Sequence, residues 1–252
     1  TDNDQVVVKE LINAIEVLFD EDVAGIGVGV PSLVDVDRGI VYAVQNIPSW
    51  KEVHLKDALE DVFHVPVYVN NDANCFAVGE CHYGKGRSYQ HIVGISIGTG
   101  LGSGIIIDRI LYNGANCGAG EIGTIPYKDE TVEYYCSGQF FSRQYGASGE
   151  NIFERAKAGD PLALQAYNEF GYEMANAMMI ALYAYDPQIV ILGGSVSQAF
   201  EFFKKSMMEK LQNNFAYQHA LKRLVIESSE LPDIPLLGAA ALHLDALEKK
   251  PK

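Results

Sequence analysis

The sequence predicts an α/β protein in which strands and helices alternate along the chain. Short runs rich in β-branched residues are followed by stretches with apolar residues at helical spacing. Strings of Asn, Asp or Gly come directly after several strand runs, which is where α/β proteins gather their ligands. At 252 residues, 48% of them hydrophobic, the chain is long enough for one large or two smaller domains with a substantial core.

The first third of the chain is predicted to alternate between helix and strand. Its opening helix carries Val7, Leu11 and Ile15 on one face at helical spacing. The alternating Val-Pro-Val-Tyr-Val run is typical of a short strand. The predicted elements are a helix over 5–18, a strand over 24–30, a loop containing Asn46, a helix near 55–63, a strand over 65–69 and a helix from 76 to about 83.

The rest of the chain is predicted to begin with a hinge of small and polar residues at 84–88. A long helix over 161–185 has Asp160 as its N-cap and Pro161 at its first position. The other predicted elements are strands over 91–97, 104–108 and 188–192, helices over 151–158, 198–211 and 238–247, and a polar tail at 248–252. The core face of the long helix is predicted to consist of Leu164, Ala175, Met178, Met179 and Leu182.

Composition excludes several classes of function. The formal net charge of -14 repels phosphate backbones, so we expect no nucleic-acid binding by this chain. No run of about 18 apolar residues and no charged-then-apolar leader occurs, so we expect no membrane span. The four cysteines show no metal-site spacing and are interpreted as small buried hydrophobes in a reducing cytoplasm. No pair of histidines has metal-ligand spacing either.

Asp72 is the candidate catalytic residue. It follows the strand run at 65–69 and stands in the string Asn-Asn-Asp-Ala-Asn. A base that removes a proton from a hydroxyl must be fixed, close and able to accept a hydrogen bond, and such a group contributes about 10²- to 10⁴-fold in rate. The alternative is that this string only caps the next helix, since Asn and Asp are preferred N-caps.

A glycine run at 98–104 lies between two predicted strands. The run reads Gly-Thr-Gly-Leu-Gly-Ser-Gly and is interpreted as the tight turn of a hairpin, whose N–H groups form an anion nest. It leads into a strand rather than a helix, which excludes the dinucleotide-binding fingerprint, and the chain has no Walker-type phosphate loop. The alternative is a hairpin turn without a ligand.

Several short strings, in order over nearly the whole chain, together resemble one family. Each string is weak alone, but their order and spacing are hard to obtain by chance. The sequence resembles the ROK family of sugar kinases and sugar-responsive repressors, and within it the glucokinase-like members without zinc. The strings lie at residues 29–35, 46–50, 71–74, 97–104, 114–116 with 119–123, 191–195 and 237–240.

The resemblance implies an actin/hexokinase-like (ribonuclease H-like) fold, with two α/β lobes that close over a cleft holding sugar and ATP. The smaller lobe would comprise residues 1–83 and 239–252, and the larger, nucleotide-binding lobe residues 84–238. The resemblance also implies Mg²⁺ as the companion of ATP, a hexose-type substrate and a homodimer.

The same resemblance implies roles for individual residues. Asp72 corresponds to the catalytic base of the family. The residues that correspond to its sugar-binding set are Asn46, Asn71 and Glu121, and Thr124 stands beside them. Those that correspond to its phosphate-contacting turn are Gly98, Thr99 and Gly100, and those that correspond to its nucleotide-binding element near the adenosine are Gly193 and Gly194.

Three departures from the family pattern limit these implications. The Asp-x-Gly-Gly-Thr motif of the first strand has no counterpart, so we expect the N-terminal strands of the smaller lobe to be missing from this sequence; the alternative is a natural form that lost the motif. Thr124 stands where most members have a sugar-contacting and zinc-binding His. The Cys-rich segment is represented at 134–141 by Cys136 alone, too few ligands for zinc, and Ser142-Arg143 replaces its closing carboxylate.

Two functions from different classes follow. In the first, the chain is an ATP-dependent hexose kinase with Asp72 as base; the changed residues around the first sugar carbons would admit a substituted or phosphorylated glycoside. In the second, it is the sugar-sensing module of a ROK-type repressor and has no catalytic activity. Asp72 and the intact glycine turn favour the kinase, and an inactive structural relative is a third alternative.

Overall fold

The computed structural model describes residues 4–42, 44, 47 and 49–248. Its largest sheet has five strands in the order β12-β11-β6-β7-β8. Strands β12, β11 and β6 are parallel, while β7 and β8 complete the sheet as antiparallel neighbours. The strands are β6 (Ile92–Ile97), β7 (Leu101–Ile107), β8 (Ile110–Leu111), β11 (Ile189–Gly193) and β12 (Val225–Ser228).

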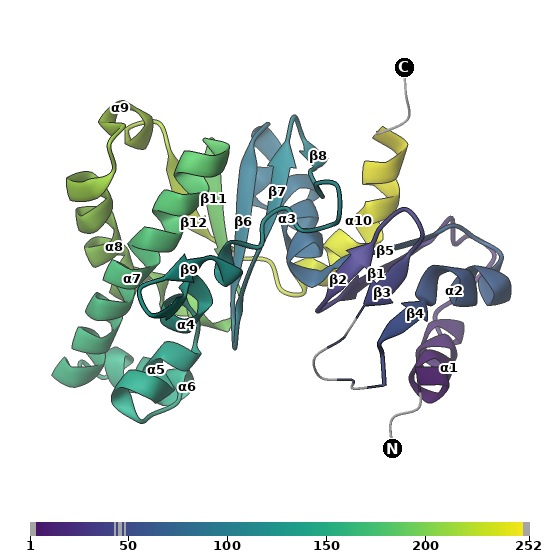
Figure 1. Cartoon of the computed structure of the whole chain (residues 1–252), viewed down its shortest axis with the longest axis horizontal. Helices are drawn as coiled ribbons and strands as arrows, with labels where there is room; N and C mark the ends of the chain where they lie inside the picture. The colour runs from purple at the N-terminus through teal and green to yellow at the C-terminus, as the bar shows by residue number, and fades with distance from the viewer. Residues whose placement is uncertain (1–3, 43, 45–46, 48, 249–252) are drawn as a thin grey trace.

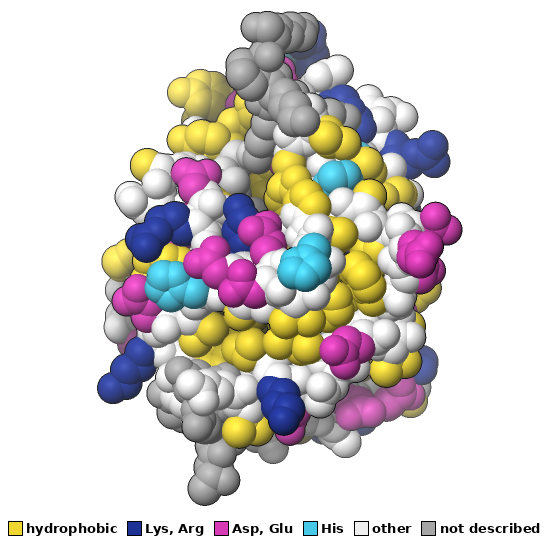
Figure 2. All heavy atoms as spheres, turned by 90° about the vertical axis from the view of Figure 1, so that its right-hand side faces the viewer, with side chains coloured by type: hydrophobic (Ala, Val, Ile, Leu, Met, Phe, Trp, Pro, Cys, Tyr) yellow, Lys and Arg dark blue, Asp and Glu magenta, His cyan; other side chains and the backbone are white. Residues whose placement is uncertain are grey.

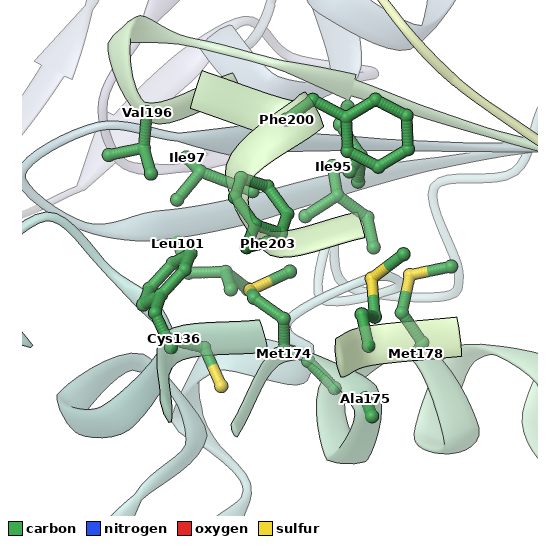
Figure 3. Packing of buried hydrophobic residues seen from close by; sticks show 14 of the residues in the cluster. Ile95, Ile97, Leu101, Cys136, Met174, Ala175, Met178, Val196, Phe200 and Phe203 are labelled. Atoms are coloured by element: carbon green, nitrogen blue, oxygen red, sulfur yellow. The ribbon is translucent and has the colours of Figure 1, made fainter. Parts of the chain in front are cut away.

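Both faces of the five-stranded sheet are apolar, and neighbouring residues point to opposite faces. On β6, Val93, Ile95 and Ile97 belong to one buried cluster, whereas Ile92 belongs to another. The first cluster fills the space between the sheet and the helices that lie between β8 and β12 in sequence (Figures 1 and 3). These helices are α4 (Val132–Cys136), α5 (Gln139–Tyr145), α6 (Gly149–Lys157), α7 (Pro161–Tyr185), α8 (Phe200–Asn214) and α9 (Gln218–Leu221).

Helices α3 (Asp72–His82) and α10 (Ile234–Glu248) form a layer between the large sheet and the N-terminal part of the chain (Figure 1). Both contribute to the second buried cluster, together with Ile189 and Ile191 of β11. The two helices approach closely, because a Cβ added to Gly238 would lie 1.7 Å from the backbone oxygen of Cys75. The layer therefore depends on glycine at its contact points.

The N-terminal part contains two small sheets. β1 (Ile26–Val30) pairs in parallel with β5 (Val67–Asn71), and β2, β3 and β4 form an antiparallel sheet. A third buried cluster lies among them. The remaining elements of the N-terminal part are α1 (Asp4–Glu16), β2 (Leu33–Asp35), β3 (Ile40–Tyr42), β4 (Glu52–His54) and α2 (Leu55–Phe63). Later in the chain, β9 (Pro126–Tyr127) and β10 (Glu130–Thr131) form a short separate hairpin.

The end of the molecule that carries α1 and α2 exposes apolar side chains. Figure 2 shows them as a band across this face, with acidic side chains and histidines around it. Val17 and Leu18, directly after α1, are each 82% exposed. Apolar surface therefore remains accessible at this end.

The predicted α/β class is confirmed, and so are the bounds predicted for α2 and α7. Asp160 caps α7 as predicted, because its side chain accepts hydrogen bonds from the N–H groups of Leu162 and Ala163. All four cysteines are free and buried, which confirms their interpretation as small hydrophobes. The division into lobes at residues 83/84 and 238/239 stays a prediction.

Several sequence predictions were wrong in detail, and one is the helix expected from residue 76, because α3 begins at Asp72. The second strand of the hairpin begins at Leu101, so the turn contains only Gly98, Thr99 and Gly100. Leu164 was assigned to the core face of α7 but is 38% exposed. The last helix begins at Ile234 rather than at Gly238.

The glycines of β7 have a packing role. A Cβ on Gly102 would lie 2.8 Å from the Cβ of Ala73, and one on Gly104 would lie 2.6 Å from the Cβ of Ala77. Both partners belong to α3, so these glycines allow that helix to lie close against the sheet.

Candidate active site

Asp72 lies where the parallel pair β1 and β5 ends. Val30, the last residue of β1, is paired with Asn71, the last residue of β5, and Asp72 is the first residue of α3. Asn71 is the N-cap: its Oδ1 accepts from the N–H groups of Ala73 at 2.9 Å and Asn74 at 3.4 Å. Its Nδ2 donates to the backbone oxygen of Ser32 at 3.2 Å. The capping interpretation is therefore right for Asn71, and it leaves the Asp72 carboxylate available for chemistry.

The Asp72 side chain is exposed to solvent, yet the protein around it raises the pKa of its carboxyl group above the ordinary value of 3.8. Desolvation is the larger cause, and the hydrogen bond that its Oδ1 accepts from the Ala73 N–H opposes it. A carboxylate that is disfavoured in its charged form accepts a proton more readily. This property suits a general base.

Two further carboxylates belong to the same site. The pKa of Glu121 is raised above 4.5 by desolvation, and then by the negative charges of Asp72 and Glu133. Glu121 precedes the short helical turn η2 (Ile122–Thr124), which the Thr124 hydroxyl closes by donating to the Glu121 backbone oxygen at 2.8 Å. Asn46 lies outside the described residues, so its predicted place in the site stays a prediction.

Glu133 was not predicted as a residue of the site. The structure places its carboxylate beside the site, because its charge raises the pKa of Glu121 and its Oε2 accepts from the Leu101 N–H. Glu133 lies in the first turn of α4, after the N-cap Thr131. The signal was a threonine cap followed by an acidic residue, which is a common helix start and was not read as part of a site.

The glycine turn is held by contacts to its carbonyl groups. The Gly98 oxygen accepts from the Gly138 N–H at 2.8 Å, and the Thr99 oxygen accepts from Gln139 Nε2 at 3.1 Å. Glu133 Oε2 accepts from the N–H of Leu101 at 2.8 Å. Within the described part of the chain, the N–H groups of Thr99 and Gly100 have no acceptor. Adjacent N–H groups of this kind form a nest for an anion such as a phosphate.

A pocket of about 530 Å³ begins at this turn. The turn follows β6, and the short helix η3 (Ser195–Ala199) follows β11, so the pocket lies at the carboxyl ends of two adjacent parallel strands. Phe141, Phe153 and Tyr167 provide aromatic walls. Its remaining lining residues are Gly98, Thr99, Gly138, Gln139, Ser142, Ser148, Gly149, Glu150, Ser195, Val196 and Gln198.

Gly193 and Gly194 do not line this pocket. A Cβ on Gly193 would lie 2.4 Å from the ring of Phe76, and Gly194 has a φ of 81° with the Ile97 oxygen 2.4 Å from its missing Cβ. These glycines are required by packing and by backbone conformation. Their contact with a nucleotide stays a prediction.

Packing between α3 and β7 fixes the distance between the carboxylate and the glycine turn. Ala73 follows Asp72 and lies against Gly102, two residues after the turn ends. The structure thus brings together Asp72, the glycine turn and the pocket from four strand ends. Within the described residues, no group of three or more His, Cys, Asp and Glu side chains is arranged to hold a metal ion.

A carboxylate at the end of one sheet, beside a glycine turn and a pocket at the end of another, fits the actin/hexokinase-like class of α/β proteins. The family model described as "ROK family" matches residues 4–246, and the chain belongs to the ROK family. No helix among the described residues has the length and apolar character needed to cross a membrane.

Relatives of both functional types are found. The xylose repressor of Bacillus subtilis is 28% identical, over 88% of this chain and 61% of the repressor. The glucokinase of Thermotoga maritima is also 28% identical, over 94% of this chain and 84% of the enzyme. The chain thus spans less than two thirds of the repressor.

Among solved structures, a ROK family glucokinase from Streptomyces griseus, determined in complex with glucose and AMPPNP, has a TM-score of 0.81 and 26% identity. The match covers 96% of this chain and 88% of the glucokinase. The actin/hexokinase-like fold predicted from the sequence is confirmed by this similarity.

Proposed function

We propose that this protein is a sugar kinase that transfers the terminal phosphoryl group of ATP to a hydroxyl of a hexose or hexose derivative. The observation that carries the proposal is the position of Asp72, whose helix is packed against the strand of the glycine turn. A base on one side of the cleft and a phosphate-binding turn on the other are the two groups that this reaction requires.

In this mechanism Asp72 accepts the proton of the attacking hydroxyl as the sugar oxygen bonds to the terminal phosphorus of ATP and the bond from that phosphorus to its bridging oxygen breaks, which releases ADP. Asn71, Glu121 and Thr124 would orient the sugar from the same side, and Asn46 is predicted to contact it as well. The Asn71 side chain already holds the start of α3, so it acts mainly by fixing Asp72. Since phosphoryl transfer is catalysed largely by positioning and electrostatics, this fixed geometry supports the proposal.

The nucleotide would extend from the glycine turn into the adjacent pocket. The free N–H groups of Thr99 and Gly100 would meet phosphate oxygens, and the aromatic walls would cover the adenosine. Gly193 and Gly194 would support this site from the end of β11. Mg²⁺ neutralises phosphate charge in such reactions and is usually bound by phosphates and waters. Among the described residues, no group of three or more His, Cys, Asp and Glu side chains is arranged to hold the ion.

A second candidate is a sugar-sensing module of a repressor, as the similarity to the xylose repressor allows. It would bind a sugar at the same residues without transferring phosphate. The resemblance further implies a cytoplasmic homodimer, which size-exclusion chromatography with light scattering would detect as twice the monomer mass.

ADP release by the full-length protein, measured with ATP, Mg²⁺ and a panel of hexoses and β-glucosides, tests the proposal. Sugar-dependent ADP release that Asp72→Asn abolishes would support a kinase with this base. Saturable sugar binding by calorimetry without turnover would overturn the kinase and favour the sensor. A strict preference for free glucose would refute the idea that the altered residues admit a substituted glycoside.

A further inference from the structure

Cys117 occupies an unusual place in the fold. It lies in the segment between β8 and η2, four residues before Glu121, yet its side chain is 2% exposed and belongs to the third buried cluster. Every other buried member of that cluster lies between residues 30 and 69. The Cys117 side chain therefore reaches out of its own loop into the core of the N-terminal part.

The sulfur is surrounded by groups from the strand–helix junction that carries Asp72. Its thiol contacts the Asn70 Oδ1 as a donor at 3.6 Å, and Asn74 Nδ2 donates to the sulfur at 3.9 Å. Asn70 and Asn74 flank Asp72 on both sides, so the sulfur contacts the supports of the proposed base.

The backbone of Cys117 supports the same interpretation. Its φ is 56°, in the left-handed region that disfavours residues with a Cβ. Such a conformation persists only when surrounding contacts hold it. Glycine would adopt this conformation without a steric cost, whereas cysteine adopts it at a cost. The contacts of the Cys117 side chain must therefore offset the strain of its backbone.

The rest of the loop is held at its ends. Asn70 Nδ2 donates to Asn113 Oδ1 at 3.1 Å, and the Ala119 N–H donates to the Asn113 oxygen at 3.2 Å. The Ser103 hydroxyl donates to the Gly120 oxygen. Cys117 supplies the contact at the middle of the loop, between these two attachments.

We propose that Cys117 is a positioning residue whose side chain ties the loop of Glu121 to the junction of Asp72, and so fixes the sugar-binding carboxylate relative to the base. This inference rests on the proposed function, in which Glu121 contacts the sugar. The sulfur needs no reactivity for this role, and burial raises the pKa of the Cys117 thiol, which keeps it protonated and able to donate.

The test compares three variants of the full-length protein. Cys117→Gly removes the side chain and at the same time relieves the backbone, so it keeps the fold accessible. Cys117→Ser retains a small donor and acceptor in the same place. Cys136→Ala is the matched control, because Cys136 is also a fully buried thiol but belongs to the cluster on the far face of the large sheet.

The first readout is hydrogen–deuterium exchange of the peptide that spans residues 113–121. We expect exchange about tenfold faster or more in Cys117→Gly, because the loop loses its middle contact. Cys117→Ser should exchange within about threefold of the wild type, and Cys136→Ala should leave this peptide unchanged. Equal loop exchange in Cys117→Gly and Cys136→Ala would overturn the proposal.

The second readout separates sugar binding from nucleotide binding. In Cys117→Gly we expect the KM for sugar to rise about tenfold while the KM for ATP changes less than about twofold, because only the sugar-binding carboxylate is displaced. Equal changes in both constants would contradict a positioning role. If the wild type shows no sugar-dependent ADP release, the proposed function fails, and the exchange experiment still decides whether Cys117 orders the loop.

Discussion

Gly102→Ala tests whether the close packing of α3 against the large sheet positions the proposed base. The added Cβ would lie 2.8 Å from the Cβ of Ala73, and among the described residues other than its chain neighbours no other heavy atom lies within 4 Å of it. Carbon atoms prefer separations of about 3.5 to 4.0 Å, so helix and strand would separate by about 0.7 Å or more. Since Ala73 follows Asp72, this displacement would occur at the base itself.

Overpacking of this kind costs about 1–3 kcal/mol, and each kcal/mol lowers the unfolding midpoint of a chain of this size by about 2–4 °C. Misplacement of a catalytic group by about 1 Å costs up to about 10²-fold in rate. Ala73→Gly alone loses one buried methyl group, about 0.8 kcal/mol, and up to about 1 kcal/mol of helix preference.

The double variant Gly102→Ala with Ala73→Gly moves the methyl group from the helix to the strand. Thermal unfolding and the kcat/KM for sugar should both recover relative to Gly102→Ala, with a coupling energy of about 1 kcal/mol or more. If the loss in the double variant equals the sum of the losses in the two single variants, the packing argument is refuted. An unchanged kcat/KM in a destabilised Gly102→Ala would show that the position of α3 does not control the base.

Three further predictions concern charge and packing. Asp72→Asn should raise the unfolding midpoint at pH 7, because the raised pKa of Asp72 means that its ionised form is disfavoured in the folded protein. The gain should vanish below pH 3.8, where the carboxyl group is neutral in both the folded and the unfolded chain. Equal midpoints of the variant and the wild type at pH 7, measured by scanning fluorimetry, would contradict this prediction. Gly238→Ala should lower the free energy of unfolding, measured in urea, by about 1–3 kcal/mol or more, since its Cβ would lie 1.7 Å from the backbone oxygen of Cys75. The control Ala240→Ser, on the exposed side of the same helix, should have a free energy of unfolding within about 0.5 kcal/mol of the wild type. Glu133→Gln keeps an acceptor for the Leu101 N–H but removes a negative charge, so the pKa of Glu121 should fall. The acid limb of the pH profile of kcat/KM should then move to lower pH. An acid limb at the same pH in variant and wild type would show that the ionisation of Glu121 does not determine it.

Much of the fold could be predicted from the sequence where local signals determine the structure. The bounds of α7 follow from the cap at Asp160, the proline at its start and Asp186-Pro187 after its end. The strands β2, β3 and β4 were not predicted, because three residues are too short to show alternation. Gly102 was assigned to the turn because a sequence pattern does not show that a helix will approach it.

The candidate site shows the same division. The place of Asp72 at a strand end and the glycine turn were predictable, since both follow local patterns. Glu133 was not, because its meaning depends on α4 lying beside the turn, which is a contact between segments 32 residues apart. Cys117 was interpreted only as a buried hydrophobe, and its contact with the junction of Asp72 appears only once the chain is folded.

The contact between α3 and α10 has a consequence for synthesis of the chain on the ribosome. Gly79 of α3 packs against Ile234, and Gly238 of α10 packs against Cys75, so the middle layer is completed only after α10 has been made. Gly238 follows Gly79 by 159 residues (238 − 79), which takes about 8 to 32 s to translate. During that interval the α10-facing side of α3 remains uncovered. A chain that terminates before Ile234 would keep this apolar surface exposed permanently, so we expect it to be a substrate for chaperones and proteases rather than a smaller folded protein.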